Sequence, residues 1–141
     1  MIKIDQIISA ADKAAILGIY EQMVANDEVD QLGYINNKIY QKIAVMESSE
    51  FETDRYIAAY AKIMFELLKQ GARDSGYLEY NKCILSALYY LCDPYDYFPD
   101  LHHKYAYIDD ALVLNQCLEL LKEQGGNTYK HICNFIRDSK I

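Results

Sequence analysis

The run Leu91-Cys92-Asp93-Pro94-Tyr95-Asp96-Tyr97-Phe98-Pro99-Asp100, followed by Tyr107-Ile108-Asp109-Asp110, decides the fold class of this chain. It contains both prolines of the protein and separates two apolar runs with a helical period. The residue before a proline is disfavoured in a helix, so a helix that reaches Cys92 must stop at Asp93. Acidic residues are favoured at helix starts, so the Asp pair at 109 and 110 predicts the next helix, with Asp109 as its N-cap. The stretch therefore predicts two helices joined by an ordered loop rich in Pro, Asp and Tyr.

Residues 82–121 resemble the YkvA-like family of small bacterial domains of unknown function. The likeness lies in a helix ending in Ala87-Leu88-Tyr89-Tyr90-Leu91, in the motif Pro94-Tyr95-Asp96-Tyr97-Phe98-Pro99-Asp100, and in a second helix opening with Ile108-Asp109-Asp110. The chain departs from the family pattern where Leu101-His102-His103 replaces an apolar-Pro pair and where Ala106 replaces a glycine. The resemblance implies a helical fold and, because the family has no settled activity, no particular reaction.

The remainder of the chain also has the periodicity of helices, and only six glycines and two prolines interrupt it. Six helices are predicted, at about residues 5–25, 29–46, 49–70, 77–92, 110–124 and from 127 or 128 onward. Short connections favour antiparallel neighbours. We therefore expect an all-α protein in which residues 1–141 form a single-domain bundle.

Apolar residues spaced three and four apart mark the predicted inner face of each helix. In the first helix they include Ala11, Ala15 and Tyr20. In the second they are Leu32, Ile35, Ile39, Ile43 and Met46, and in the third Ile57, Ala61, Met64, Phe65 and Leu68. Ser49 and Glu52 have the spacing of a capping box at the start of the third helix, and Gly71 is its predicted end.

Composition and charge exclude several classes of function. The formal net charge of −7 argues against binding to nucleic acid or to anionic lipid, both of which require a basic face. No apolar run approaches the ~20 residues that cross a bilayer, and no signal peptide is visible, so a cytoplasmic protein is expected. The four cysteines lack zinc-site spacing, and we predict them to be free thiols inside helices.

The clustered aspartates have two interpretations. In the first they are turn and cap residues that join two helices, since Asp side chains bind nearby backbone amides. In the second, Asp96, Asp100, Asp109 and Asp110 form an oxygen-ligand site for Mg²⁺, Mn²⁺ or Ca²⁺ that activates water in a small metal-dependent hydrolase. The first interpretation requires no cofactor, and no catalytic residue is predicted under it.

A binding function fits the composition better than catalysis. The chain has 14 Tyr and no Trp, and several of the tyrosines lie in the acidic loop. Tyr side chains anchor protein interfaces, and acidic charge selects and attracts a basic partner. We expect a non-enzymatic module of the inhibitor or immunity type that masks a basic protein such as a toxin, or else a homodimer. The predicted contact residues are Asp93, Tyr95, Tyr97, Tyr105 and Tyr107.

Overall fold

The computed structural model describes residues 1–4, 8–25, 31–73, 80–92, 107–124, 127–139 and 141, without the side chains of residues 31, 71–73, 80 and 81. Within these residues the chain forms six α-helices and no strand. They are α1 (Ala10–Ala25), α2 (Gln31–Glu47), α3 (Glu52–Arg73), α4 (Tyr80–Cys92), α5 (Ile108–Gln124) and α6 (Asn127–Asp138). The protein is thus an all-α bundle, as the sequence predicts.

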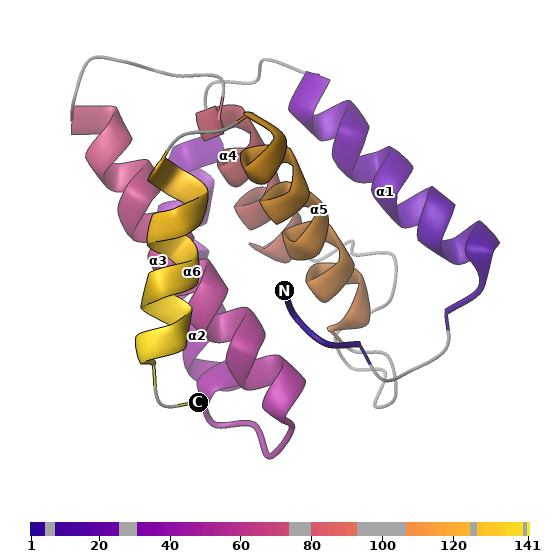
Figure 1. Cartoon of the computed structure of the whole chain (residues 1–141), viewed down its shortest axis with the longest axis horizontal. Helices are drawn as coiled ribbons and strands as arrows, with labels where there is room; N and C mark the ends of the chain where they lie inside the picture. The colour runs from indigo at the N-terminus through magenta and orange to yellow at the C-terminus, as the bar shows by residue number, and fades with distance from the viewer. Residues whose placement is uncertain (5–7, 26–30, 74–79, 93–106, 125–126, 140) are drawn as a thin grey trace.

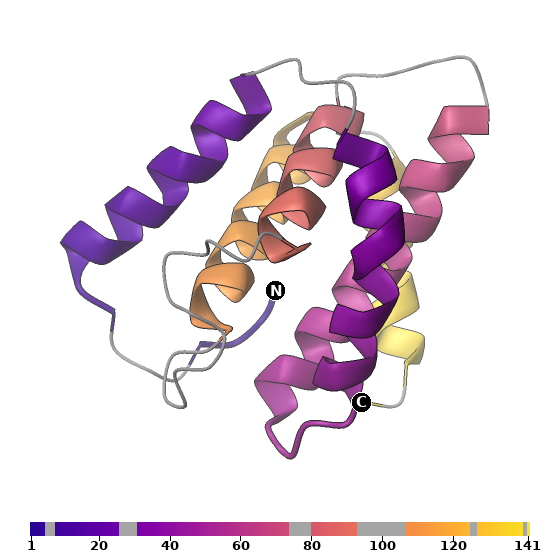
Figure 2. The same cartoon turned by 180° about the vertical axis from the view of Figure 1, so that it is seen from behind.

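Helix α4 is at the centre of the bundle. It packs against α1, α2, α3 and α5, while α6 packs against α3 and α5. The pair α4–α5 lies between α1 on one side and the group α2, α3 and α6 on the other (Figure 1), and the reverse view shows the same order (Figure 2). Because α4 is surrounded, residues 83–92 are buried except for the half-buried Tyr89. A helix that is apolar on nearly every side is the expected occupant of such a position.

The predicted inner faces of the second and third helices are confirmed. In α2, Ile35, Ile39, Ile43 and Met46 are all buried and Leu32 packs against the core. In α3 the five predicted positions are buried as well. The prediction for α1 is wrong at Ala11 and Ala15, which are exposed, because the core-facing residues of this helix are Ile16 and Tyr20.

Three predicted helix ends differ from the structure. α3 continues to Arg73, so Gly71 lies inside the helix and does not end it. α1 begins at Ala10, later than predicted. α5 begins at Ile108, and the amide of Ala111 donates to the carbonyl of Tyr107 at 3.0 Å, so Tyr107 takes the N-cap position that the sequence analysis gave to Asp109.

The capping box predicted for Ser49 and Glu52 is wrong, because α3 begins at Glu52 and the amide of Arg55 donates to the carbonyl of Phe51 at 3.3 Å, which makes Phe51 the N-cap. The hydroxyl of Ser49 accepts from the amide of Phe51 at 3.1 Å and donates to the carboxylate of Asp54 at 2.6 Å. Ser49 therefore lies two residues before the N-cap, and its hydroxyl bonds to Asp54 in the first turn of α3. Burial raises the pKa of Asp54, and the bond from Ser49 and the charge of Arg55 oppose that rise.

Candidate functional site

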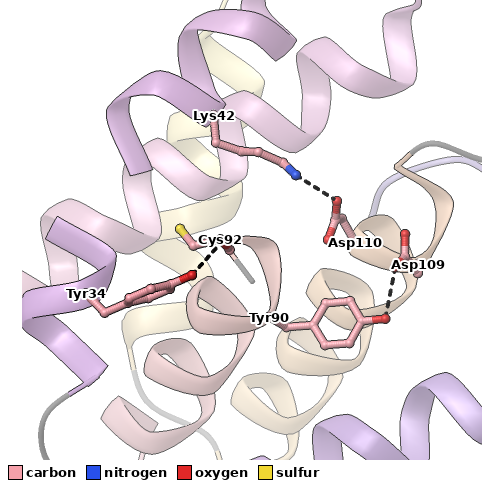
Figure 3. A network of polar contacts seen from close by, with 6 residues as sticks. All are labelled: Tyr34, Lys42, Tyr90, Cys92, Asp109 and Asp110. Carbon is pink, nitrogen blue, oxygen red and sulfur yellow. Dashed lines mark hydrogen bonds and ion pairs between the residues drawn. The ribbon is translucent and has the colours of Figure 1, made fainter. Parts of the chain in front are cut away.

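The aspartate pair at the start of α5 is completely buried. Asp109 and Asp110 have exposed fractions of 0% and 1%, which is rare for carboxylates. The hydroxyl of Tyr90, on α4, donates to Oδ2 of Asp109 at 3.0 Å (Figure 3). Tyr90 is itself buried, so this bond lies in the interior between the two central helices. The pair also lies in the first turn of α5, where the helix dipole stabilises negative charge.

Lys42 of α2 brings a positive charge to the second carboxylate. Its Nζ lies 3.9 Å from Oδ2 of Asp110, and its side chain is only 14% exposed. The same ammonium lies 5.0 Å from the centre of the Tyr107 ring, a cation–π distance. A buried carboxylate is costly without such compensation. Lys42 therefore links α2 to the start of α5.

Tyr34 provides another link from α2 to the central helices. Its hydroxyl donates to the carbonyl of Cys92, at the end of α4, at 3.4 Å (Figure 3). Its ring lies 5.3 Å from that of Tyr89, and Nζ of Lys38 lies 4.7 Å from the Tyr34 ring centre. The last carbonyls of a helix have no partner within it, so Tyr34 satisfies one of them from a neighbouring helix.

The structure brings together only part of the predicted site. Asp109, Asp110 and Tyr107 lie side by side on α5 and just before it, but the two aspartates are interior groups held by Tyr90 and Lys42. Asp93, Asp96, Asp100, Tyr95, Tyr97 and Tyr105 lie outside the described residues. Among the residues that are described, no group of three or more His, Cys, Asp or Glu side chains could hold a metal ion.

Sequence reasoning missed Tyr34, Lys42 and Tyr90 as members of this network. Tyr90 could have been found, because it lies in an apolar run where a buried hydroxyl requires a partner. Lys42 could not, because a lysine between Ile39 and Ile43 also fits the exposed side of an amphipathic helix.

A second buried polar group joins α1 to α4 and α5. Tyr20 is fully buried and its hydroxyl donates to the carbonyl of Cys83 at 2.8 Å. Burial, followed by the nearby Cys117, raises the pKa of Tyr20 far above its ordinary value. Burial also raises the pKa of the Cys117 thiol to about 12, against a hydrogen bond with Tyr20 that lowers it. Cys83, Cys92 and Cys117 are buried and form no disulfide, as predicted. The raised pKa of Cys117 makes its thiol a poor nucleophile.

The exposed junction of α2 and α3 carries a fixed aromatic ring, that of Tyr40 on α2. Tyr40 is 55% exposed, and its ring meets that of Phe65 nearly edge-on, with centres 5.5 Å apart. Nζ of Lys69 donates to the Tyr40 hydroxyl at 3.1 Å and pairs with Glu66 at 2.9 Å. The bond with Tyr40, followed by the one with Glu66, raises the pKa of Lys69.

Two open hollows continue from Tyr40 along α3. The first, of about 190 Å³, is lined by Tyr40 and Phe65 among others. The second, of about 240 Å³, is lined by Arg55 and by Phe135 of α6, which is 37% exposed. Glu47 and Lys62 line both hollows, so the two are neighbours. We call Tyr40, Phe135 and these two hollows the Tyr40 face.

No helix in the described part of the chain is both long and apolar enough to cross a bilayer. Comparison with protein-family models, with curated proteins and with solved structures finds no match to this chain.

Proposed function

We propose that this chain is a non-enzymatic protein-binding module and that the Tyr40 face contacts its partner. The observation that carries the proposal is the display of Tyr40, a large ring that is more than half exposed and yet held by Lys69 and Phe65. Aromatic anchors of this kind contribute most to binding energy when little conformational entropy is lost on contact. Phe135, which lines the second hollow, offers a second anchor.

Charges on the Tyr40 face are largely paired within the protein. Lys62 lies 3.3 Å from Glu47, and Lys69 lies 2.9 Å from Glu66. These pairs are exposed and contribute little to stability. A partner can cover these ion pairs without burying an unbalanced charge. We therefore assign the binding energy to the aromatic rings of Tyr40 and Phe135.

The acidity of the chain is concentrated outside the described residues. The segments outside the description contain nine of the 21 Asp and Glu residues but only two of the 14 Lys and Arg residues. The described part therefore has twelve acidic and twelve basic residues. These segments thus account for the whole formal net charge of −7. Charge of this kind accelerates association with a basic protein. It supports a basic partner, as for an inhibitor or immunity-type protein that masks a toxin.

Site-specific photocrosslinking tests this proposal. A photoreactive phenylalanine analogue would replace Tyr40 in one variant and Lys13, an exposed residue of α1, in the control. After illumination of cells that produce the protein, we expect a discrete covalent adduct with a basic protein from position 40 and none from position 13. An equal yield from both positions, or no adduct at all, would contradict the proposal. An adduct of the chain with a second copy of itself would show that the Tyr40 face forms a homodimer and does not bind a basic partner.

A second candidate function is a small divalent-metal-dependent hydrolase, and it is favoured by the burial of two adjacent carboxylates. Asp109 and Asp110 lie at the start of α5, close in sequence to Asp96 and Asp100. If those residues met, four carboxylates would suit Mg²⁺, Mn²⁺ or Ca²⁺. Tyr90 and Lys42 already engage the buried pair, which is why the binding module is preferred. Thermal melting with and without these metal ions separates the two.

A further inference from the structure

Burial alternates along the N-terminal segment Met1–Ile4, as it does along an extended strand. Ile2 is 3% exposed and belongs to the hydrophobic core, and Ile4 packs against that core. Met1 and Lys3, in contrast, are exposed. Alternate residues of an extended chain point to opposite sides, so this segment presents two aliphatic side chains, two positions apart, to the bundle.

A single side chain binds both backbone groups of Ile2. The amide of Ile2 donates to Oδ1 of Asn115 at 2.8 Å, and Nδ2 of Asn115 donates to the carbonyl of Ile2 at 2.9 Å. Asn115 therefore imitates a neighbouring β-strand, since it supplies one acceptor and one donor to the same residue. Thr53 of α3 adds a bond from its hydroxyl to the carbonyl of Lys3 at 3.3 Å.

These contacts recognise a backbone and a spacing, not one particular sequence. All three hydrogen bonds go to main-chain atoms, which every extended peptide provides. The side-chain requirement is an aliphatic residue in the buried position of Ile2 and a second one two residues later. Peptides that bind as an added strand are recognised in the same way. Main-chain hydrogen bonds supply the affinity, and pockets for alternate side chains supply the specificity.

The segment also covers a site between separate helices. Asn115 is on α5 and Thr53 is near the start of α3, so Met1–Ile4 spans two elements. The bonds between Ile2 and Asn115 place the segment beside α5, and the N-terminus is drawn next to that helix in Figure 1. Without a resident segment, an apolar position would face water, and exposed apolar surface of this kind promotes association.

We propose that Asn115 and the buried position of Ile2 form a binding site for an extended segment of a partner protein, with aliphatic residues two positions apart. Met1–Ile4 occupies this site as an intramolecular stand-in that the partner segment displaces. Because the stand-in is tethered, its effective concentration is high, and a partner binds only when its own affinity exceeds that competition. The site is separate from the Tyr40 face and does not depend on the function proposed above.

A peptide-binding experiment on the full chain tests this inference. Ile2→Asp expels the segment, because an unpaired charge cannot remain in the core. Ile19→Asp makes the same chemical change at an exposed position of α1 and serves as the matched control. The probe is a fluorescent peptide with the sequence of residues 1–6, Met-Ile-Lys-Ile-Asp-Gln, and its control has the Ile and Lys at positions 2 and 3 exchanged.

We expect the probe to bind Ile2→Asp saturably and to bind Ile19→Asp, in which the segment is intact, at least about tenfold more weakly. The exchanged peptide should lose about tenfold in affinity, and so should the probe when Asn115→Leu is added to Ile2→Asp. If a folded Ile2→Asp variant binds neither peptide, or binds both equally, Met1–Ile4 is only an anchor of the fold. A wild-type dimer that Ile2→Asp dissociates would assign the site to a second copy and overturn the inference.

A measurement on the wild-type chain covers the case in which Ile2→Asp does not fold. In a nuclear magnetic resonance titration with the unlabelled probe, the backbone amides of Ile2 and Ile4 should move to positions typical of disordered peptide. The side-chain amide of Asn115 should stay in its bound position, since the probe replaces the bonds made by Ile2. Unchanged Ile2 and Ile4 signals at millimolar probe would contradict the proposal.

Discussion

Single hydroxyl and carboxylate groups hold the centre of this bundle together. The bond from Tyr90 to Asp109 lies between two side chains that are 2% and 0% exposed, so neither group can exchange its partner for water. Hydrogen bonds to buried charged groups contribute more to stability than those between neutral groups at the surface. Lys42 adds an ion pair to Asp110 at 3.9 Å, with its own side chain 14% exposed.

Tyr90→Phe tests the first of these contacts. It removes one oxygen and leaves the ring, so the free energy of unfolding should fall by about 2 kcal/mol. The control is Tyr56→Phe, at a half-buried tyrosine of α3, which should change it by less than about 0.5 kcal/mol. Urea unfolding followed by circular dichroism measures both. Equal effects of the two variants would show that the Asp109 bond is unimportant.

Cys117 gives the folded state a sensitivity to alkali. Its pKa is raised from 9.0 to about 12, first because the thiol is buried. The unfolded thiol loses its proton near pH 9, while the folded thiol keeps it up to about pH 12. The stability that this thiol contributes to the free energy of unfolding is therefore fully present below pH 9 and is lost between pH 9 and 12. Between pH 8 and pH 10 this loss is about 1 kcal/mol.

Cys117→Val should therefore reduce the fall in unfolding free energy over that pH range by about 1 kcal/mol. Val113→Ala, at a buried position of α5 without a titratable group, is the control: it lowers the free energy of unfolding at both pH values and should leave the fall between them unchanged. Urea titrations at the two pH values measure the difference. A fall of the same size in the Cys117→Val variant and in the wild type would refute the assignment.

At the scale of helices, α1 has an interior glycine that its own surroundings do not require. A Cβ added at Gly18 would meet nothing within 4 Å, and the residue lies in the middle of Ala10–Ala25. Glycine costs a helix interior about 1 kcal/mol relative to alanine. Gly18→Ala should therefore raise the free energy of unfolding by about 0.5–1 kcal/mol, as measured by urea unfolding. A decrease would mean that the helix is strained or crowded there.

The existence of all six helices could be predicted, because apolar spacing depends only on local sequence. Gly71 shows the limit of such rules, since tertiary packing can carry a helix past a residue that usually ends it. Asp109 shows another limit. A cap residue and a buried second residue of a helix look alike in sequence, and only the approach of Tyr90 from another helix distinguishes them.

For the molecule as a whole, the network that joins α2, α4 and α5 is separate from the surfaces that we assign to binding. Asp109 and Asp110 are inside the bundle, whereas Tyr40 lies on its outer side and Asn115 holds the N-terminal segment. The aspartate pair at the start of α5 thus contributes to the architecture. We infer that these buried aspartates stabilise the junction of α2, α4 and α5 and do not hold a metal.

Thermal melting of the chelator-treated protein with and without Mg²⁺, Mn²⁺ or Ca²⁺ tests that claim most directly. A metal bound at a hundred times its dissociation constant would stabilise the fold by about 2.7 kcal/mol and raise Tm by several degrees. We predict a change of less than about 1 °C with each ion, in the wild type and in the Asp109→Asn/Asp110→Asn variant alike. A saturable rise in Tm that this double variant abolishes would contradict the claim and favour the metal-dependent hydrolase.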